Sequence, residues 1–490
     1  MKKKIITYFL TVSILISAIF FAGGCQSSCA KNKNLTTYDI TATLDGNTLT
    51  ATQTVDFYNG YDTTFTELKF NLFGNAFRKG AKYNPIANEH LSQAYYDGQN
   101  FGGMEILSVS SNETPLNFNV GGQDLTLLTV ELSKEVFPNE RYLLTINYTL
   151  NLAKVVARTG VNKSTINLGN FYPILCAYDT GVGFYECLYY AIGDPFYSDC
   201  ANYNVTLSAD SEYVFAHSGA LSKEEINGNV KTVEFSLQNA RSVAVVLSKK
   251  FNVEKRLVDG VEISYYHYND ANPKLSLDTA EKSIRYFNQT FGAYPYSTYS
   301  VVETAFVQGG MEYPALVMIS DNLEEKAYQE VIVHETAHQW WQTAVGNNEI
   351  EYGFLDEGLA EYSVVLFYEN HPEYGYTRQT LIDSSNKSYK VFCSVYDQIF
   401  GNLNTKMLRP LNEFSGEFEY VNMAYIKPCI MYDTLRTTVG EQTFFSALKK
   451  YYEKYKFINA TPYDLVGTFE KAGADTNGYF ESFFSGKAIL

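Results

Sequence analysis

A short run, HETAH at residues 334–338, constrains this chain more than any other feature of its sequence. On a helix, His334 and His338 lie one turn apart on the same face, where two imidazoles can bind one Zn²⁺. Glu335, beside them, can deprotonate a water at the metal. A catalytic zinc takes a third protein ligand and keeps one position open for water, and Glu357 is the natural candidate. The sequence therefore predicts one Zn²⁺ per chain.

The surroundings of this run favour a metal site over a chance occurrence in a solvated helix. The flanks are apolar, with VIV at 331–333 and both tryptophans of the chain at 340–341. Polar side chains inside an apolar helix are costly unless they bind something. Asp321 is a candidate N-cap and Gly346 a candidate stop, so a helix is predicted over 322–345.

Two further stretches occur in order around the zinc motif. GGMEYP at 309–314 precedes it and YIKP at 425–428 follows it. Alone, the first is typical of a bulged turn before proline, and a tyrosine in a chain with 41 of them is usually a packing residue. Together with HETAH and with LDEGLAEY at 355–362, they resemble the aminopeptidase N family of gluzincin zinc peptidases.

This resemblance implies roles for the upstream stretch. Glu312 would bind the free α-amino group of a peptide, while Gly309 and Gly310 would let the backbone approach the substrate closely. The position after Glu312 is Tyr313, where the family has Asn. No clear match occurs to the N-terminal segment that helps to hold the amine in many relatives, and Glu186 is only a weak candidate for that role.

The downstream stretch implies a catalytic tyrosine. Tyr425 would donate a hydrogen bond to the oxyanion, with Tyr420 as a rival, and Pro428 replaces the usual Gly. Glu335 would then take a proton from water and pass it to the leaving amine.

The N-terminus is typical of a targeting segment. Three lysines precede an apolar stretch over residues 5–22, and small residues precede Cys25. We interpret 1–24 as a lipoprotein signal peptide and 25–34 as a tether, which gives a cell-surface protein outside the cytoplasm, attached to the membrane through a lipidated Cys25. An uncleaved anchor or ordinary signal cleavage are the alternatives. The pairing of the other six cysteines stays open.

The remaining chain divides into two patterns. Residues 35–250 contain short alternating stretches such as NTLTATQTVDFYN, typical of antiparallel sheet. From 251, VEISYYHY predicts a strand and 276–291 an amphipathic helix. The resemblance implies an N-terminal β-sandwich (35–250) followed by a thermolysin-like α+β catalytic domain (251–490).

Composition excludes a disordered protein and a nucleic-acid-binding protein. Hydrophobic residues make up 46% and charged residues 19% of the chain, which excludes a disordered protein. A net charge of −16 without a basic stripe excludes nucleic acid as a partner and leaves peptides.

The predicted function is hydrolysis of the N-terminal peptide bond of peptides. Large relatives carry a C-terminal helical domain over the active site, for which this sequence holds no counterpart, so a more open cleft is expected. Two alternatives follow: a zinc endopeptidase with an open cleft, and a weakly active zinc-containing surface protein whose task is binding.

Overall fold

The computed structural model describes residues 34–401 and 403–488. The predicted signal peptide, the Cys25 that is predicted to carry a lipid, and the tether up to residue 33 lie outside the described residues. Among the helices that are described, none is both long enough and apolar enough to cross a membrane.

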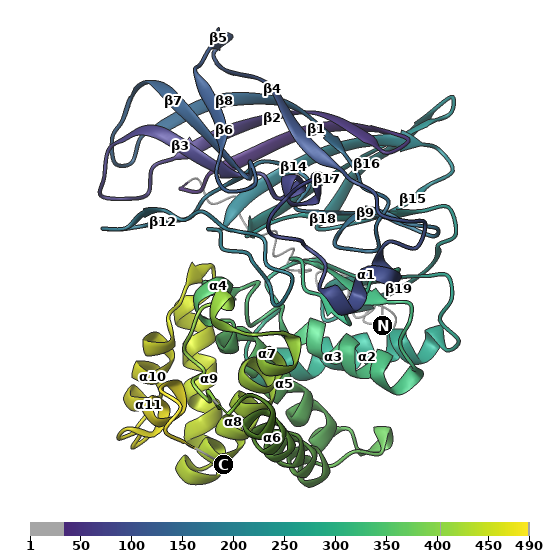
Figure 1. The fold of residues 1–490 in the computed structure, drawn as a ribbon. Helices are drawn as coiled ribbons and strands as arrows, with labels where there is room; N and C mark the ends of the chain where they lie inside the picture. Colours follow the sequence, from purple (N-terminus) through teal and green to yellow (C-terminus); the bar gives the residue numbers. More distant parts are fainter. Residues whose placement is uncertain (1–33, 402, 489–490) are drawn as a thin grey trace, which may run out of the picture.

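The N-terminal region is built from β-strands (Figure 1). Its largest sheet has eight strands in the order β16-β17-β14-β1-β2-β8-β4-β5. The only parallel pair among these is β1 with β14; the other neighbours are antiparallel. In chain order the strands are β1 (Thr37–Asp45), β2 (Thr48–Tyr58), β4 (Gly103–Ser111), β5 (Thr114–Pro115), β8 (Arg141–Asn151), β14 (Ala201–Asp210), β16 (Ala220–Asn227) and β17 (Val230–Ala240).

Alternation of buried and exposed residues explains this sheet. In β1, Ile40, Ala42 and Leu44 are buried while the residues between them are exposed. Side chains in a strand alternate between the two faces, so one face of the sheet supplies core and the other meets solvent.

Two four-stranded sheets and the short hairpin of β12 (Tyr178–Asp179) and β13 (Gly183–Phe184) also belong to this region. The orders of the four-stranded sheets are β15-β18-β10-β9 and β11-β3-β7-β6. The strands are β3 (Phe65–Asn71), β6 (Phe118–Gly121), β7 (Leu127–Val136), β9 (Thr159–Val161), β10 (Ile166–Gly169), β11 (Ile174–Leu175), β15 (Val214–His217) and β18 (Ala244–Ser248).

The C-terminal region begins with a mixed five-stranded sheet in the order β19-β20-β21-β23-β22. Strands β20, β21 and β23 are parallel, whereas β19 and β22 run antiparallel to their neighbours. Strand β22 stands at one end of the strand order and is therefore an edge strand. The strands are β19 (Asn252–Val258), β20 (Val261–His267), β21 (Thr298–Thr304), β22 (Gly310–Met311) and β23 (Leu316–Ser320).

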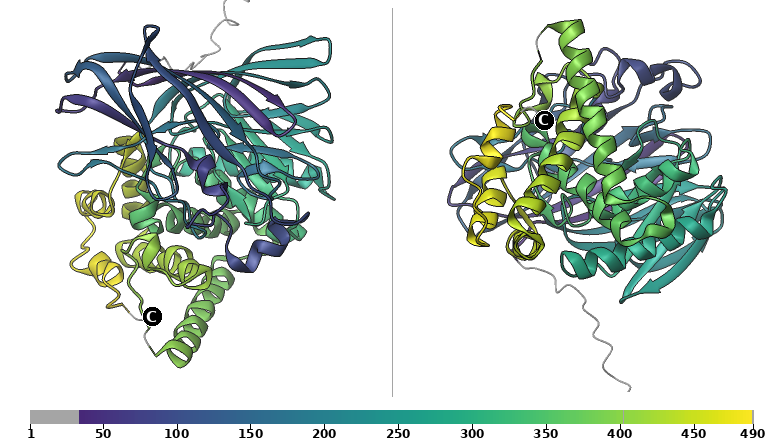
Figure 2. Two further views of the ribbon diagram at one scale, coloured as in Figure 1. Left: turned by 45° about the horizontal axis from the view of Figure 1, so that its top comes forward. Right: turned by 90° about the horizontal axis from the view of Figure 1, so that it is seen from below.

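Helices occupy most of the chain after this sheet, on the side away from the N-terminal sheets (Figures 1 and 2). They are α2 (Pro273–Thr290, between β20 and β21), α3 (Glu325–Ala337), α4 (Glu349–Tyr352), α5 (Phe354–Asn370), α6 (Arg378–Phe400), α7 (Glu417–Val421), the π-helical turn η5 (Asn422–Ile426), α8 (Lys427–Val439), α9 (Glu441–Tyr455), α10 (Pro462–Lys471) and α11 (Tyr479–Phe484). A β-sheet region followed by a mixed α and β region confirms the predicted fold class.

The predicted extent of the zinc-motif helix is wrong at both ends. Helix α3 begins at Glu325 without a side-chain cap and ends at Ala337, well before residue 345. After it the chain turns, and Val345–Gly346 forms β24, which pairs with β25 (Ile458–Asn459). Gly346 is therefore a strand residue, because pairing with a segment more than a hundred residues away prevails over local helical preference.

The second predicted helix also begins earlier than expected. Helix α2 starts at Pro273 rather than near residue 276. Proline suits the first turn of a helix, because its missing N–H has no acceptor there and its φ is already helical.

Arg241 connects the two regions. Its side chain donates to the carbonyl oxygens of Ser198 (2.9 Å), Gln342 (2.8 Å) and Ile458 (2.9 Å). These acceptors come from the β region, from the turn after α3 and from β25, so one buried guanidinium fixes three segments around the end of the zinc-motif helix.

Candidate metal centre and substrate cleft

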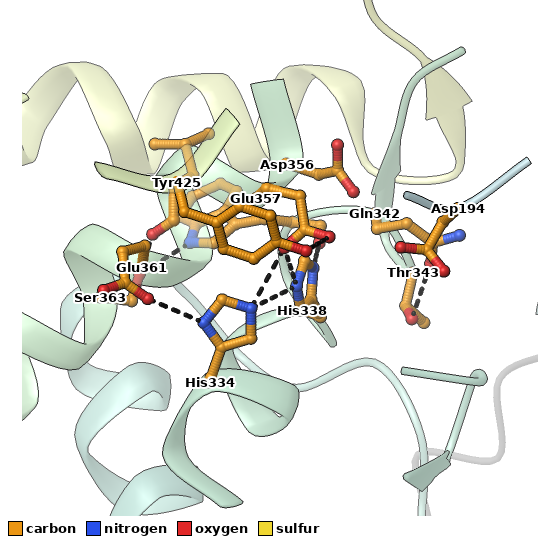
Figure 3. Close-up of polar contacts among 12 residues, drawn as sticks. Asp194, His334, His338, Gln342, Thr343, Asp356, Glu357, Glu361, Ser363 and Tyr425 are labelled. Atoms are coloured by element: carbon orange, nitrogen blue, oxygen red, sulfur yellow. Dashed lines mark hydrogen bonds and ion pairs between the residues drawn. The ribbon is translucent and has the colours of Figure 1, made fainter. Parts of the chain in front are cut away.

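Three side chains converge at the C-terminal end of α3 and the first turn of α5 (Figure 3). The Nε2 atoms of His334 and His338 lie 3.0 Å apart, and each lies 3.1 Å from Glu357 Oε2. Ligands about 2.0–2.1 Å from a tetrahedral zinc are about 3.3 Å apart, so this spacing fits such an ion. The nitrogen and carboxylate donor set is also the one zinc takes in peptidases.

Both imidazoles are oriented by a contact at the other ring nitrogen. His338 Nδ1 donates to the carbonyl oxygen of Trp341 at 3.0 Å. His334 Nδ1 lies 3.3 Å from Glu361 Oε2, one turn after Glu357 on α5. Such partners fix the ring and leave Nε2 as the atom that faces a metal.

In the metal-free protein, a protonated imidazole balances the negative charge of the Glu357 carboxylate. Burial lowers the pKa of His334, but hydrogen bonds to Glu357 and Glu361 outweigh it and raise the value to about 10. Burial would raise the pKa of Glu357, yet the two imidazoles hold it below its usual range. The carboxylate is therefore anionic and the imidazole cationic, so a bound dication would replace protons.

Glu335 lies in the same cavity with a free oxygen. It is 5% exposed, and its Oε2 has no hydrogen-bond partner among the described residues. Burial, and next the charge of Glu312, raise its pKa to about 8. A dication held by the neighbouring histidines would favour the carboxylate form of Glu335, which can accept a proton from water.

The two glycines before Glu312 differ in what their positions require. A Cβ built at Gly310 would lie 2.3 Å from Glu335 Oε1, so any larger residue there would displace the Glu335 carboxylate. At Gly309 it would meet only Val331 Cγ2, at 3.5 Å, which is an ordinary contact. The structure thus explains Gly310 by close packing and gives no steric reason for Gly309.

Glu312 follows the edge strand β22 and is 4% exposed. Its Oε1 has no hydrogen-bond partner in the described part of the chain. Burial, and then the charge of Asp194, raise its pKa to about 7. Oxygens of Glu312 and Asp356 lie within 4.8 Å of a His338 nitrogen, which places Glu312 at the His338 end of the metal cluster.

Tyr313 extends toward the N-terminal region. Its hydroxyl donates to Asn170 Oδ1 at 2.7 Å, and its ring leaves no room for a Cβ at Gly169. The tyrosine at this position therefore holds the segment after β22, which includes Glu312, against the N-terminal β region.

Tyr425 lies on the π-helical turn η5 and reaches the metal cluster. Its hydroxyl donates to Glu357 Oε1 at 2.5 Å, and its ring stacks on His334 with centroids 5.7 Å apart. Tyr420 packs edge-on against Tyr425 and also lines the cleft. Pro428 lies against Gly358 of α5, where no Cβ would fit.

Asp194 is one of the acidic residues of the cleft that no sequence motif identifies. Asp194, from the β region, lines the cleft and pairs with the buried Arg158. Glu186, the residue considered for this region, is exposed and does not line the cleft. No local spacing distinguishes Asp194 from other acidic residues, because its partners come from distant segments.

The cleft has a volume of about 300 Å³ and a strongly acidic lining. Its carboxylates are Asp194, Glu312, Glu330, Glu335, Glu357, Glu361 and Glu417. Two of its basic side chains are already paired, Arg158 with Asp194 and His90 with Glu417. A cationic group is therefore the ligand that this lining favours.

The fold and the cluster of His334, His338 and Glu357 are those expected of a zinc metallopeptidase, and known proteins share features with this chain. The peptidase family M1 domain matches residues 275–483. Aminopeptidase M1-A of Oryza sativa subsp. japonica is 26% identical over 295 residues, which are 56% of this chain and 33% of the rice protein. Mouse aminopeptidase RNPEPL1 is 28% identical over 214 residues, 41% of this chain and 28% of that protein.

Solved structures share the fold over nearly the whole chain. An M1 zinc metallopeptidase from Deinococcus radiodurans superposes with a TM-score of 0.66 at 15% identity, covering 94% of this chain and 96% of that one. The match of residues 275–483 to the peptidase family M1 domain, together with this shared fold, supports the predicted resemblance to the aminopeptidase N type of gluzincin. The matches span about a third of the length of these two curated relatives.

Proposed function

We propose that this chain is a zinc-dependent aminopeptidase in which His334, His338 and Glu357 hold the metal. The observation that carries this proposal is the buried carboxylate of Glu312 at the His338 end of the cluster, whose Oε1 has no hydrogen-bond partner within residues 34–401 and 403–488. A carboxylate in that place can bind the ammonium group of a peptide and so bring the first peptide bond to the metal. An endopeptidase has no need of such a group.

The chemistry divides among the surrounding side chains. When bound, zinc polarises the carbonyl to be cleaved and lowers the pKa of water. Glu335 takes a proton from the attacking water and returns it to the departing amine. Tyr425 turns its hydroxyl from Glu357 to the developing oxyanion, to which it donates a hydrogen bond.

The test is hydrolysis of leucyl and arginyl fluorophore amides and of a decapeptide, each with a free and an acetylated N-terminus. Wild type is compared with Glu335→Gln, which keeps the size of the side chain but cannot accept the proton. We expect cleavage of free-amine substrates alone, loss of at least about 1,000-fold in Glu335→Gln, and equal zinc content in both proteins.

Two results would contradict the proposal in different ways. Equal cleavage of acetylated peptides would establish an endopeptidase. Zinc binding without hydrolysis of any peptide would establish a binding protein.

We also propose attachment to a cell-surface membrane through a lipidated Cys25. The support is the sequence alone, with its basic start, apolar stretch and small residues before the cysteine. Metabolic labelling with a fatty acid tests it: wild type should incorporate label and Cys25→Ser should not. Label in neither protein would overturn the proposal.

A further inference from the structure

Helix α3 sets the direction in which a peptide crosses the cleft. Glu330, His334 and His338 occupy successive turns of one face, and both Glu330 and the histidines line the cavity. Glu312 lies at the His338 end. A peptide whose N-terminus is held at Glu312 and whose first bond lies at the histidines therefore continues past His334 toward Glu330.

Glu330 is a partly buried carboxylate without a partner. Among the described residues it makes no hydrogen bond and no ion pair within 4.0 Å, although Lys326 lies one turn earlier on the same helix. The Lys326 ammonium lies instead 5.9 Å from the centre of the Tyr376 ring. Burial, and then the charge of Glu361, raise the pKa of Glu330 to about 7, so an approaching cation would relieve an unfavourable pair of carboxylates.

Other groups in the same cavity independently indicate a ligand of positive charge. Glu312 Oε1 and Glu335 Oε2 belong to side chains more than nine-tenths buried, and neither atom has a hydrogen-bond partner in the part of the chain that is described. The ammonium and the metal account for these two oxygens. They leave Glu330 without an ion-pair partner among the described residues, and Glu361 faces His334 through its Oε2 atom, 3.3 Å from His334 Nδ1.

We propose that Glu330, with Glu361 beside it, forms the subsite for the residue after the cleaved bond and selects lysine or arginine there. This inference rests on the proposed aminopeptidase function and adds its substrate class: peptides with a basic second residue. The long side chains of lysine and arginine can keep their stems against Val331, which also lines the cleft, while the charged end reaches the two carboxylates.

The experiment compares Leu-Xaa-Ala-Ala peptides in which Xaa is Lys, Arg, Ala or Glu, together with a leucyl fluorophore amide that has no second residue. The proteins are wild type, Glu330→Gln, Glu330→Lys and the control Glu325→Gln. Glu325 is an exposed residue on the same helix and does not line the cleft, so the control removes the same charge elsewhere.

We expect kcat/KM of wild type to be about tenfold or more higher for Lys than for Ala at the second position. In Glu330→Gln the ratio should fall to within about threefold, and in Glu330→Lys the Glu peptide should be preferred to the Lys peptide. Glu325→Gln should keep the wild-type ratio and cleave the amide as wild type does.

A wild-type ratio near one, or a ratio unchanged in Glu330→Gln, would overturn the subsite while the aminopeptidase function stands. Calorimetry of the Lys and Ala peptides binding to the inactive variant Glu335→Gln distinguishes failure of the subsite from failure of the aminopeptidase function. Tighter binding of the Lys peptide supports the subsite even without hydrolysis, and equal binding overturns it.

Discussion

Replacing Glu312 by Gln should weaken catalysis strongly without weakening the fold. The change keeps the shape of the side chain and removes its charge. Two unit charges of opposite sign about 3 Å apart attract each other by roughly 5 kcal/mol at an effective dielectric constant of 20. The cost of desolvating both groups offsets part of this energy. Removing one partner of such a buried pair costs about 2–5 kcal/mol. We take about 3 kcal/mol, which corresponds to about a 150-fold loss of kcat/KM.

The fold should tolerate this change because Glu312 Oε1 has no hydrogen-bond partner among the described residues. Glu303 is the matched control. It is 1% exposed, and one of its carboxylate oxygens accepts from the backbone N–H groups of Tyr268 (2.6 Å) and Asn269 (2.8 Å). Glu303→Gln should therefore lose about 1–2 kcal/mol of unfolding free energy yet keep kcat/KM within about threefold of wild type.

The assay measures hydrolysis of a leucyl fluorophore amide and, in parallel, urea unfolding of the metal-free proteins. Either of two results would refute the reasoning. If Glu312→Gln cleaves the free-amine substrate within about threefold of the wild-type rate, Glu312 has no part in substrate binding. If the variant loses as much stability as Glu303→Gln, Glu312 is a structural residue.

Three further outcomes are expected. Tyr425→Phe should lower kcat by about 100-fold with little change in KM or zinc content, because the ring still stacks on His334 while the hydroxyl is gone. In the metal-free protein the raised pKa of His334, about 10, contributes stability that is complete below about pH 6.5 and is lost as pH rises through 10. Zinc must displace that proton, so titration calorimetry at pH 7.5 in buffers of different ionisation enthalpy should show proton release; buffer-independent heats would contradict it. Arg158→Met should cost about 3–5 kcal/mol of unfolding free energy, because Asp194 is left buried and uncompensated, and adding Asp194→Asn should recover most of it in urea unfolding.

The features that the sequence predicts well depend on fixed local spacing. The strands of the β region follow period-two alternation, as in β1, and the fold class is confirmed on that basis. His334 and His338 follow one helical turn, and the structure brings Glu357 to them. Spacing of this kind is set by backbone geometry, which tertiary contacts change little.

The features that the sequence misses depend on partners far along the chain. The zinc-motif helix ends at Ala337 because two tertiary contacts hold the segment after it. Val345–Gly346 pairs with Ile458–Asn459, and the Gln342 carbonyl oxygen accepts a hydrogen bond from Arg241. Asp194 reaches the cleft from the β region only because that region packs against the catalytic sheet. Neither contact leaves a periodic signal in the local sequence, so an analysis of windows along the chain does not detect it.

The π-helical turn that carries Tyr425 holds one residue more than an α-helical turn would, because its hydrogen bonds run from residue i to i+5. Removing a single residue from Asn422–Ile426 would let α7 and α8 join as one regular helix. The wide turn absorbs the additional residue, so the side chains before and after it would keep their directions, whereas those within it, Tyr425 among them, would change direction. Such a shortened protein should be as well folded as its parent, yet its tyrosine hydroxyl would face away from Glu357. Within this segment, therefore, chain length itself is under functional constraint, separately from the identity of any side chain.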